Sequence, residues 1–511
     1  MEMLLLFLVA IPIIVIFLVK LRYTHNHPPS PPGLPLLGNL YQLNQESPHK
    51  YLWELSKKYG PLMFMKLGFS QLVVISSSRI AKEVLKTHDF AFSGRPSFLG
   101  QRKLSYNGLD VAFSPYNNYW REMKKICTLH LFSPKKVQSF RPIREDEVSR
   151  MINRVTQLAS SSKLVNLSEI MSSLSSNISC IVGFGKRYDE KGYESKRFSK
   201  LLCEAQAMIG GFFLSDYFPI FGRWIDCIFT RKANRLEKIY NELDLFYQEL
   251  IEEHLSPTRP KSMDGDIIDM LIALRDQNQS SSSLNLTWDH IKAVLMVFSL
   301  LNLDIFIAGT DTNAAALVWA MTALMKEGGS ARRKLQQGIR ELVGKKGRVY
   351  EDDIQNLPYL RAVIKETLKL YPPAPLIPRE TMEKCIIDGY EIKQNTPVSI
   401  NAWAIGRDPE CWENPDEFIP ERFCDVNNNG IVDYKSGEFE MIPFGGGRRG
   451  CPGISLGVAT VELALANLLY AFDWELPYGM VKEDIDIDTL PGMTMHKKNP
   501  LCLVAKKYLL Q

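Results

Sequence analysis

Residues 444–453 read Phe-Gly-Gly-Gly-Arg-Arg-Gly-Cys-Pro-Gly, and they say more about the architecture of this chain than any other segment. The glycines around Cys451 let backbone N–H groups approach its sulfur, and such hydrogen bonds tune a sulfur that binds a metal. Arg448 and Arg449 supply positive charge that lowers the pKa of a thiol or pairs with an anion. The apolar stretch Ile454–Tyr470 predicts a buried helix with Cys451 near its positive N-terminal end. The pattern therefore indicates a thiolate that binds iron.

Two other interpretations of the same run have to be considered. Gly445, Gly447 and Gly450 match the dinucleotide-binding pattern G-x-G-x-x-G. The strand-like Phe439–Phe444 precedes them, and Asp473 follows at a distance suited to a ribose contact. The run also fits a tight turn around a buried, unreactive cysteine, as most free cysteines are. The rest of the chain decides whether a haem site or a βαβ unit is present.

The run fits Phe-x-x-Gly-x-Arg-x-Cys-x-Gly at every fixed position, and it resembles the haem-binding loop of the cytochrome P450 family. The resemblance implies that Cys451 is the axial thiolate ligand of a haem b iron. It further implies that Arg449 pairs with a haem propionate and that Phe444 packs beside the sulfur. It covers nearly the whole chain from Pro31 onward and is closest to plant microsomal members of the family.

The segment Ala308-Gly-Thr-Asp-Thr312 resembles the oxygen-activating part of the family's long central helix. By itself it fits an ordinary helix end at Gly309, with capping by the residues that follow. The resemblance implies instead that Gly309 opens the helix where dioxygen binds, that Thr312 hydrogen-bonds the dioxygen and that Asp311 helps to deliver protons. The surrounding segment Trp288–Lys326 is predicted to be the longest helix and to run through the core, because it is apolar on nearly every face.

Further aromatic and basic residues are implied to hold the haem propionates. Trp120-Arg-Glu-Met-Lys124 resembles the family's helix whose tryptophan and basic residue touch these groups. Lys124 stands where arginine is usual, and a propionate accepts lysine as a point charge. Arg379 is the other basic residue that the resemblance assigns to the cofactor.

A charge network behind the haem loop is also implied. Lys365-Glu-Thr-Leu-Lys369 resembles the family's Glu-x-x-Arg helix and Pro420-Glu-Arg-Phe423 its partner loop, so Glu366, Lys369 and Arg422 would form this network. Lys369 replaces the family's arginine; it keeps the charge but loses the planar fork that binds two carboxylate oxygens. Because breaking such a network costs about 3–5 kcal/mol, a catalytically weakened haem protein is the alternative function.

A second departure from the family is Val297–Leu303, which reads as an insertion in the central helix. Seven residues at about 100° each turn a helix by about 700°, almost two full turns, so both flanks keep their facing to within about 20°. The upstream half would still move roughly 10 Å along the axis. We expect the loop near Ser280–Ser283 to absorb the shift, and the insertion is the other reason to consider a weakened protein.

Composition and periodicity agree with one large, mainly helical α+β domain, which the resemblance implies to be the cytochrome P450 fold. Hydrophobic residues make up 45% of the 511 residues, and a net charge of +4 gives no indication of nucleic-acid binding. Nine cysteines without a C-x-x-C pair are typical of a reduced, cytosol-facing chain. Helices are predicted over Trp120–Leu131, Arg144–Leu158 and Asn234–Leu255, with Ser133-Pro134 stopping the first. Strands are predicted over Gly68–Ser76, in a small N-terminal sheet with later strands, and over Ile386–Ile392 and Pro397–Ile400.

The N-terminus has the pattern of a membrane anchor. Met3–Val19 contains no charged residue and is followed by Lys20 and Arg22. A helix of this length spans roughly 26 Å, which suffices for a thin bilayer. A cleaved signal peptide is the competing interpretation, but here the positive charges follow the apolar run instead of preceding it.

The predicted domain organisation has three parts. Residues 1–22 form a single transmembrane helix, residues 23–40 a hinge whose prolines make a stiff, extended spacer, and residues 41–511 the haem-thiolate catalytic domain. Because positive residues stay cytoplasmic, the catalytic domain is expected to face the cytosol. The resemblance implies that the membrane is the endoplasmic reticulum.

The resemblance implies a monooxygenase that inserts one atom of O2 into a hydrophobic substrate, with electron donation from the thiolate driving O–O cleavage. We expect NADPH and flavins to act only through a partner, an NADPH-cytochrome P450 reductase, because the haem loop already explains the single glycine match. The segments implied to line the pocket are rich in Phe, Leu, Met and Ile, which suits an aromatic plant specialised metabolite. They are Ser97–Phe113, Met208–Phe213, Leu300–Ala308, Ala374–Ile377 and Leu490–Met495.

Overall fold

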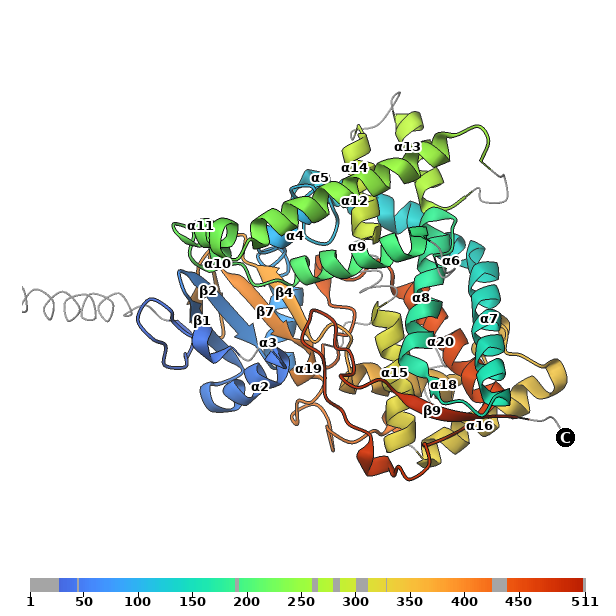
Figure 1. The fold of residues 1–511 in the computed structure, drawn as a ribbon. Coiled ribbons are helices and arrows are strands. Elements are labelled where there is room, and N and C mark those ends of the chain that lie inside the picture. Colours follow the sequence, from blue (N-terminus) through green and yellow to red (C-terminus); the bar gives the residue numbers. More distant parts are fainter. Residues whose placement is uncertain are drawn as a thin grey trace, which may run out of the picture.

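The computed structural model describes residues 27–43, 46–188, 193–259, 265–278, 285–299, 311–327, 329–424 and 439–508. Within these ranges, helices form most of the body, and the largest sheet lies on the side where the described chain begins (Figure 1). The predicted anchor, Gly309, the loop at Ser280–Ser283 and the part of the insertion after Ser299 lie outside the described residues.

The largest sheet joins two N-terminal strands with two strands from much later in the chain. Its order is β1 (Leu62–Leu67), β2 (Ser70–Ile75), β7 (Pro397–Asn401) and β4 (Leu376–Glu380). β2 and β7 are parallel, with Val73 opposite Val398, and the other neighbours are antiparallel. The prediction that an N-terminal strand pairs with later strands is therefore confirmed, and Pro397–Ile400 is confirmed as a strand.

The prediction of one strand over Ile386–Ile392 is wrong. The segment forms a hairpin of β5 (Cys385–Ile387) and β6 (Tyr390–Ile392), in which Ile387 pairs with Tyr390. Asp388 and Gly389 between them have φ of 51° and 80°. Positive φ at both central residues is the geometry of a two-residue hairpin turn, for which Asp-Gly is a preferred sequence.

The three predicted helices are confirmed as α5 (Asn118–Ile126), α7 (Arg141–Ser160) and α12 (Lys232–Leu255), the first continued by a π-helical turn. This helical stretch ends at Leu131, just before Ser133-Pro134 as predicted, and the pair has a second role. Pro134 is the first residue of the next helix, α6 (Pro134–Ser139), and the Ser133 hydroxyl caps it by accepting from the Lys136 N–H. Proline suits this position because the first N–H groups of a helix have no intrahelical partner.

The core is built around α15 (Thr312–Lys326), α18 (Pro358–Leu370), α20 (Ile454–Ala471) and α8 (Leu167–Phe184). α20 confirms the predicted buried helix; it is long and apolar enough to cross a membrane, but 61% of it is buried inside the protein. α14 (Trp288–Ser299) and α15 are the described parts of the predicted central helix. The remaining elements are α2 (Pro48–Tyr59), α3 (Ser78–Lys82), α4 (Leu99–Leu104), α9 (Tyr193–Ile209), α10 (Leu214–Tyr217), α11 (Gly222–Trp224), α13 (Ile267–Asn278), α16 (Gly329–Val343), α17 (Glu351–Ile354), α19 (Ala402–Ile405), β3 (Val165–Asn166), β8 (Phe472–Glu475) and β9 (Cys502–Lys507).

The described part of the proline-rich segment, which is predicted to be a stiff spacer, contacts the largest sheet. The Pro29 carbonyl accepts from the Phe64 N–H of β1 at 2.8 Å, and Leu34 and Gly38 bond to each other across a tight turn. The Asn39 side chain accepts from the Lys66 N–H at 2.9 Å and donates to the Pro31 carbonyl at 3.2 Å. Proline has no backbone N–H but keeps its carbonyl as a hydrogen-bond acceptor, and the segment contacts the sheet through such carbonyls.

Candidate active site

The glycine-rich loop holds Cys451 just before α20, as predicted. Gly445 and Gly447 have φ of 70° and 63°, the left-handed region that side chains disfavour. A Cβ added to Gly447 would lie 2.1 Å from the Asp89 carboxylate, so only glycine fits there. The Cys451 N–H donates to the Phe444 carbonyl at 3.0 Å and closes the loop.

The dinucleotide interpretation of this loop is wrong. Phe439–Phe444, which would have to be its strand, contains turns and irregular backbone and no strand. Asp473, its proposed ribose contact, lies in β8 and pairs with Arg340 at 2.9 Å. The glycines therefore serve the loop around the cysteine.

A cavity of about 260 Å³ adjoins Cys451 and brings together most of the predicted site residues. Besides Cys451, those that line it are Phe444, Arg449, Trp120, Lys124, Arg379 and Thr312. Its other walls are mainly apolar, from Val111 and Phe113 before α5, Ile364 and Leu368 on α18, and Met493 near the C-terminus. Segments far apart in sequence thus converge on one thiol.

Four cations surround this cavity: Arg95, Lys124, Arg379 and Arg449. Arg449 donates through Nε to the Ser93 carbonyl and through Nη2 to the Ser114 carbonyl, both at 2.7 Å. Its Nη1 is buried and has no hydrogen-bond partner among the described residues. An unpaired guanidinium nitrogen in a buried site is costly, so an anionic group is the partner that fits.

The lowered pKa values of these cations also indicate positive charge that lacks an anionic partner. Burial and the charge of Arg95 lower the pKa of Arg449 to about 9, and burial lowers that of Lys124 to about 8. Burial and the neighbouring arginines lower the pKa of Arg379 well below its ordinary value. Asp110 offsets little of this charge, since burial raises its pKa to about 7. The apolar cavity, the thiol and the cluster of cations fit a haem whose two propionates face the cations.

Trp120 and Lys124 have protein partners in addition to lining the cavity. The Trp120 indole N–H donates to the Val111 carbonyl at 2.8 Å, and its ring packs on the Arg449 guanidinium at 4.1 Å. Lys124 Nζ donates to the carbonyls of Arg448 and Gly450 at 2.8 and 2.7 Å. Both residues therefore also fix the loop that carries the cysteine.

Asp311 and Thr312 are the described residues of the segment Ala308–Thr312, and their side chains point to different places. Thr312 begins α15 and lines the cavity, as predicted, whereas Asp311 does not line it. The Asp311 carboxylate points instead to two other segments. It accepts from Gln206 of α9 at 3.3 Å and lies 2.8 Å from Nε2 of His496.

The implied charge network is present as buried contacts. Glu366 Oε1 lies 3.4 Å from Lys369 Nζ, and Oε2 lies 3.1 Å from Arg422 Nε, in an ion pair that is not aligned as a hydrogen bond. Lys369 Nζ also donates to the Pro415 carbonyl at 2.8 Å. Burial raises the pKa of Glu366 and lowers that of Lys369 to about 8. Lys369 therefore keeps the carboxylate contact, which gives no support to a weakened protein.

Replacing Lys369 by arginine is expected to stabilise the fold by about 1 kcal/mol, because a guanidinium can bond both Glu366 and the Pro415 carbonyl. The midpoint of thermal unfolding of the haem-loaded protein measures this. Lys365→Arg on the same helix is the control and should leave the midpoint unchanged. A lower midpoint for Lys369→Arg would mean that the site is shaped for lysine.

Sequence reasoning missed three residues of this region: Arg95, Gln206 and His496. Arg95 donates to the carbonyls of Ala112 and Pro378, lines the inner cavity and links the loop before α5 to strand β4. A basic residue before a proline in a polar loop gives no signal of this role. Gln206 and His496 lie in α9 and in the C-terminal loop, and no local pattern connects them to Asp311.

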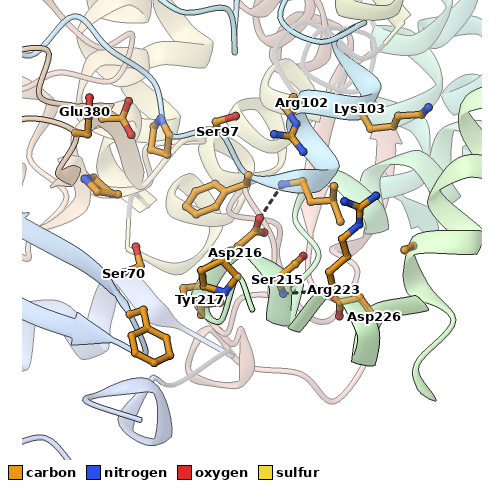
Figure 2. Close-up of a pocket in the computed structure, with 18 of the residues that line it drawn as sticks. Ser70, Ser97, Arg102, Lys103, Ser215, Asp216, Tyr217, Arg223, Asp226 and Glu380 are labelled. Carbon is orange, nitrogen blue, oxygen red and sulfur yellow. Dashed lines mark hydrogen bonds between the residues drawn. The ribbon is translucent and has the colours of Figure 1, made fainter. Parts of the chain in front are cut away.

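A larger cavity of about 900 Å³ opens at the surface, where polar and charged side chains from α4 and the α10–α11 region face it (Figure 2). An isolated antiparallel β-bridge between the backbones of Gly94 and Glu380 lies between this outer cavity and the inner one. Successive residues of a strand point to opposite sides, so Arg95 and Arg379 line the inner cavity while Pro96 and Glu380 line the outer one. Cys451 does not line the outer cavity.

Comparisons with known proteins extend over nearly the whole chain. A family model described as "Cytochrome P450" matches residues 28–504. A 5-OH-xanthotoxin synthase of Pastinaca sativa is 53% identical over 493 residues, which cover 95% of this chain and 94% of that protein. A 6,7,8-trihydroxycoumarin synthase of the same plant is 52% identical over 490 residues, covering 94% and 93%. A solved structure of a zebra fish cytochrome P450 with abiraterone has a TM-score of 0.71 and 23% identity, over 90% of this chain and 100% of that one, and confirms the predicted fold.

Proposed function

The chain belongs to the cytochrome P450 family and is a haem-thiolate monooxygenase, and from this premise we propose that its substrate is a coumarin, hydroxylated on the aromatic ring system. The observation that carries the substrate class is the likeness, above 50% identity over more than 90% of the chain, to two enzymes named for hydroxylated products. The inner cavity supports it, since its walls are mainly apolar and include Phe113 and Ile377. A flat, uncharged aromatic molecule suits such walls.

The sulfur of Cys451 would bind the haem iron. The propionates would be held by Arg449, Arg379 and Lys124. When bound, this group supplies the activation of O2 with electrons received from a partner reductase. Thr312 at the cavity wall would hold a proton donor in place through its hydroxyl. The apolar residues exclude water from the site and orient the ring that is hydroxylated.

We further propose that residues 1–22 anchor the protein in the membrane of the endoplasmic reticulum, with the catalytic domain facing the cytosol. Exposed apolar residues support an attachment on the side where the described chain begins. Leu36 of the proline-rich segment is 68% exposed. Ile220 and Phe229, which flank α11, are 85% and 68% exposed. α11 and β1 lie on the same side of the molecule (Figure 1).

The experiment is turnover by the full chain, expressed in membranes together with a plant NADPH-cytochrome P450 reductase. Coumarins that carry an open ring position are offered beside a flavonoid and a monoterpene. We expect a product heavier by one oxygen atom from a coumarin, formed only with NADPH and labelled when the gas is ¹⁸O2. Turnover of the flavonoid or the monoterpene in preference to every coumarin would refute the substrate class while leaving the monooxygenase intact.

A further inference from the structure

The acid of the oxygen-activating segment has a histidine partner from the other end of the chain. His496 Nε2 lies 2.8 Å from Asp311 Oδ2, and Gln206 Nε2 donates to the same oxygen at 3.3 Å. Asp311 directly precedes Thr312, whose side chain lines the inner cavity. The carboxylate is thus held at the edge of the cavity by two side chains that contribute nothing to the cavity wall.

The loop around His496 is fixed on both sides. The Met495 N–H donates to the Pro373 carbonyl at 2.9 Å, and the Met495 carbonyl accepts from the buried Trp319 indole at 2.7 Å. Lys497 bonds to Asp486 at 2.6 Å and forms a bridge with Thr489. The backbone position of His496 is therefore determined without its side chain, and its contact with Asp311 is not needed to close the loop.

The contact also offers little stability to the fold. The side chains of His496 and Asp311 are 31% and 21% exposed, so water still reaches both groups and weakens what their contact adds to stability. A role in folding is thus a weak explanation for a histidine placed there. The contact of His496 with Asp311, the neighbour of Thr312, is better explained by a role in the reaction.

We propose that His496 is a positioning residue for the acid: its Nε2–H group holds the Asp311 carboxylate in the orientation from which protons reach the Thr312 side of the cavity. This inference rests on the monooxygenase function stated above and adds no bond-making step. His496 acts through Asp311 and does not touch the substrate. Gln206 supplies the second donor to the same carboxylate oxygen and limits its rotation.

The same loop also contributes to the substrate cavity. Met493, three positions before His496, lines the inner cavity, while its neighbours in the loop are held by Pro373 and Trp319. The loop that places His496 against Asp311 therefore also borders the cavity in which the substrate would bind.

The test compares His496→Ala and His496→Gln with Lys498→Gln, a control that removes an exposed charge from the same loop. With reductase, NADPH and substrate, one measures product and hydrogen peroxide formed per NADPH consumed, because late or misdirected protons divert reduced oxygen to peroxide. The alanine variant is expected to lower the share of NADPH that ends in product at least about threefold. Glutamine, whose Nε2 can take the place of the histidine nitrogen, should restore it to within about twofold, and the control should match the parent.

A second measurement separates this role from a general disturbance of the loop. The dissociation constant of the substrate, from the absorbance shift of the oxidised haem, should change less than about twofold in His496→Ala, since the backbone is held independently. In an Asp311→Asn background the alanine substitution should lower the product share no further. An equal loss in both backgrounds, or an unchanged product share in His496→Ala, would overturn the proposal. If no coumarin is a substrate, any ligand that is turned over serves equally, so failure of the substrate class is recognised separately.

Discussion

Replacing Cys451 by serine is expected to abolish the strongly red-shifted Soret band of the reduced, carbon-monoxide-bound protein and to reduce monooxygenase activity to background. Cys451 is the one cysteine that lines the inner cavity among the described residues. A serine hydroxyl stays protonated at neutral pH and donates far less electron density to iron than a thiolate does. A serine would therefore not supply the electron donation that haem-dependent O–O cleavage needs, although the cations would still hold the propionates.

The measurement is the difference spectrum of membranes that contain the variant, together with the ratio of haem to protein. Cys502→Ser is the matched control, because Cys502 is a partly exposed cysteine in β9 whose backbone pairs with β3. The control should keep the red-shifted band and full haem content. A red-shifted band that survives in Cys451→Ser would mean that another residue ligates the iron, and the reading of the loop would be wrong.

The conformation of the glycine-rich loop around Cys451 was predictable because the residues that determine it are consecutive in the chain. Gly445 and Gly447 adopt positive φ, Arg449 turns into the cavity, and Cys451 stands at the start of a helix, all within eight residues. Each of these features depends on local conformation, so the pattern of residue types is sufficient to predict the loop. The same holds for Glu366 and Lys369, which are one helical turn apart and therefore lie on one face.

Features that depend on distant segments could not be predicted in this way. Arg95 reaches the cavity only because a bridge joins Gly94 to Glu380, and that register is absent from the local sequence. His496 meets Asp311 because Trp319 and Pro373 fix the C-terminal loop on α15. The hairpin at Asp388-Gly389 is different: its turn signal is local and present in the sequence, so two strands could have been predicted there instead of one.

Replacing Glu366 by alanine is expected to prevent the accumulation of folded haem protein. The side chains of Glu366 and Lys369 are fully buried, and that of Arg422 is only 13% exposed. Removing the carboxylate leaves two cations without a counter-charge and the Ile419 N–H without its acceptor. Breaking a buried pair from one side costs about 3–5 kcal/mol, a large part of the roughly 5–15 kcal/mol that holds a folded protein together. The ratio of haem to protein and the midpoint of thermal unfolding measure the loss.

Two further variants identify the cause of this loss. Glu462→Ala is the matched control: Glu462 is also a buried helical glutamate, but it has one cationic partner, Arg361, at 3.3 Å. A smaller loss is expected, because Glu462→Ala deprives one cation of its partner instead of two. Adding Lys369→Met to Glu366→Ala removes the cation with no exposed surface and should recover part of the midpoint, because the uncompensated charge is the main cost. Equal losses in Glu366→Ala and Glu462→Ala, with no recovery in the double variant, would show that lost packing and not unpaired charge destabilises the core.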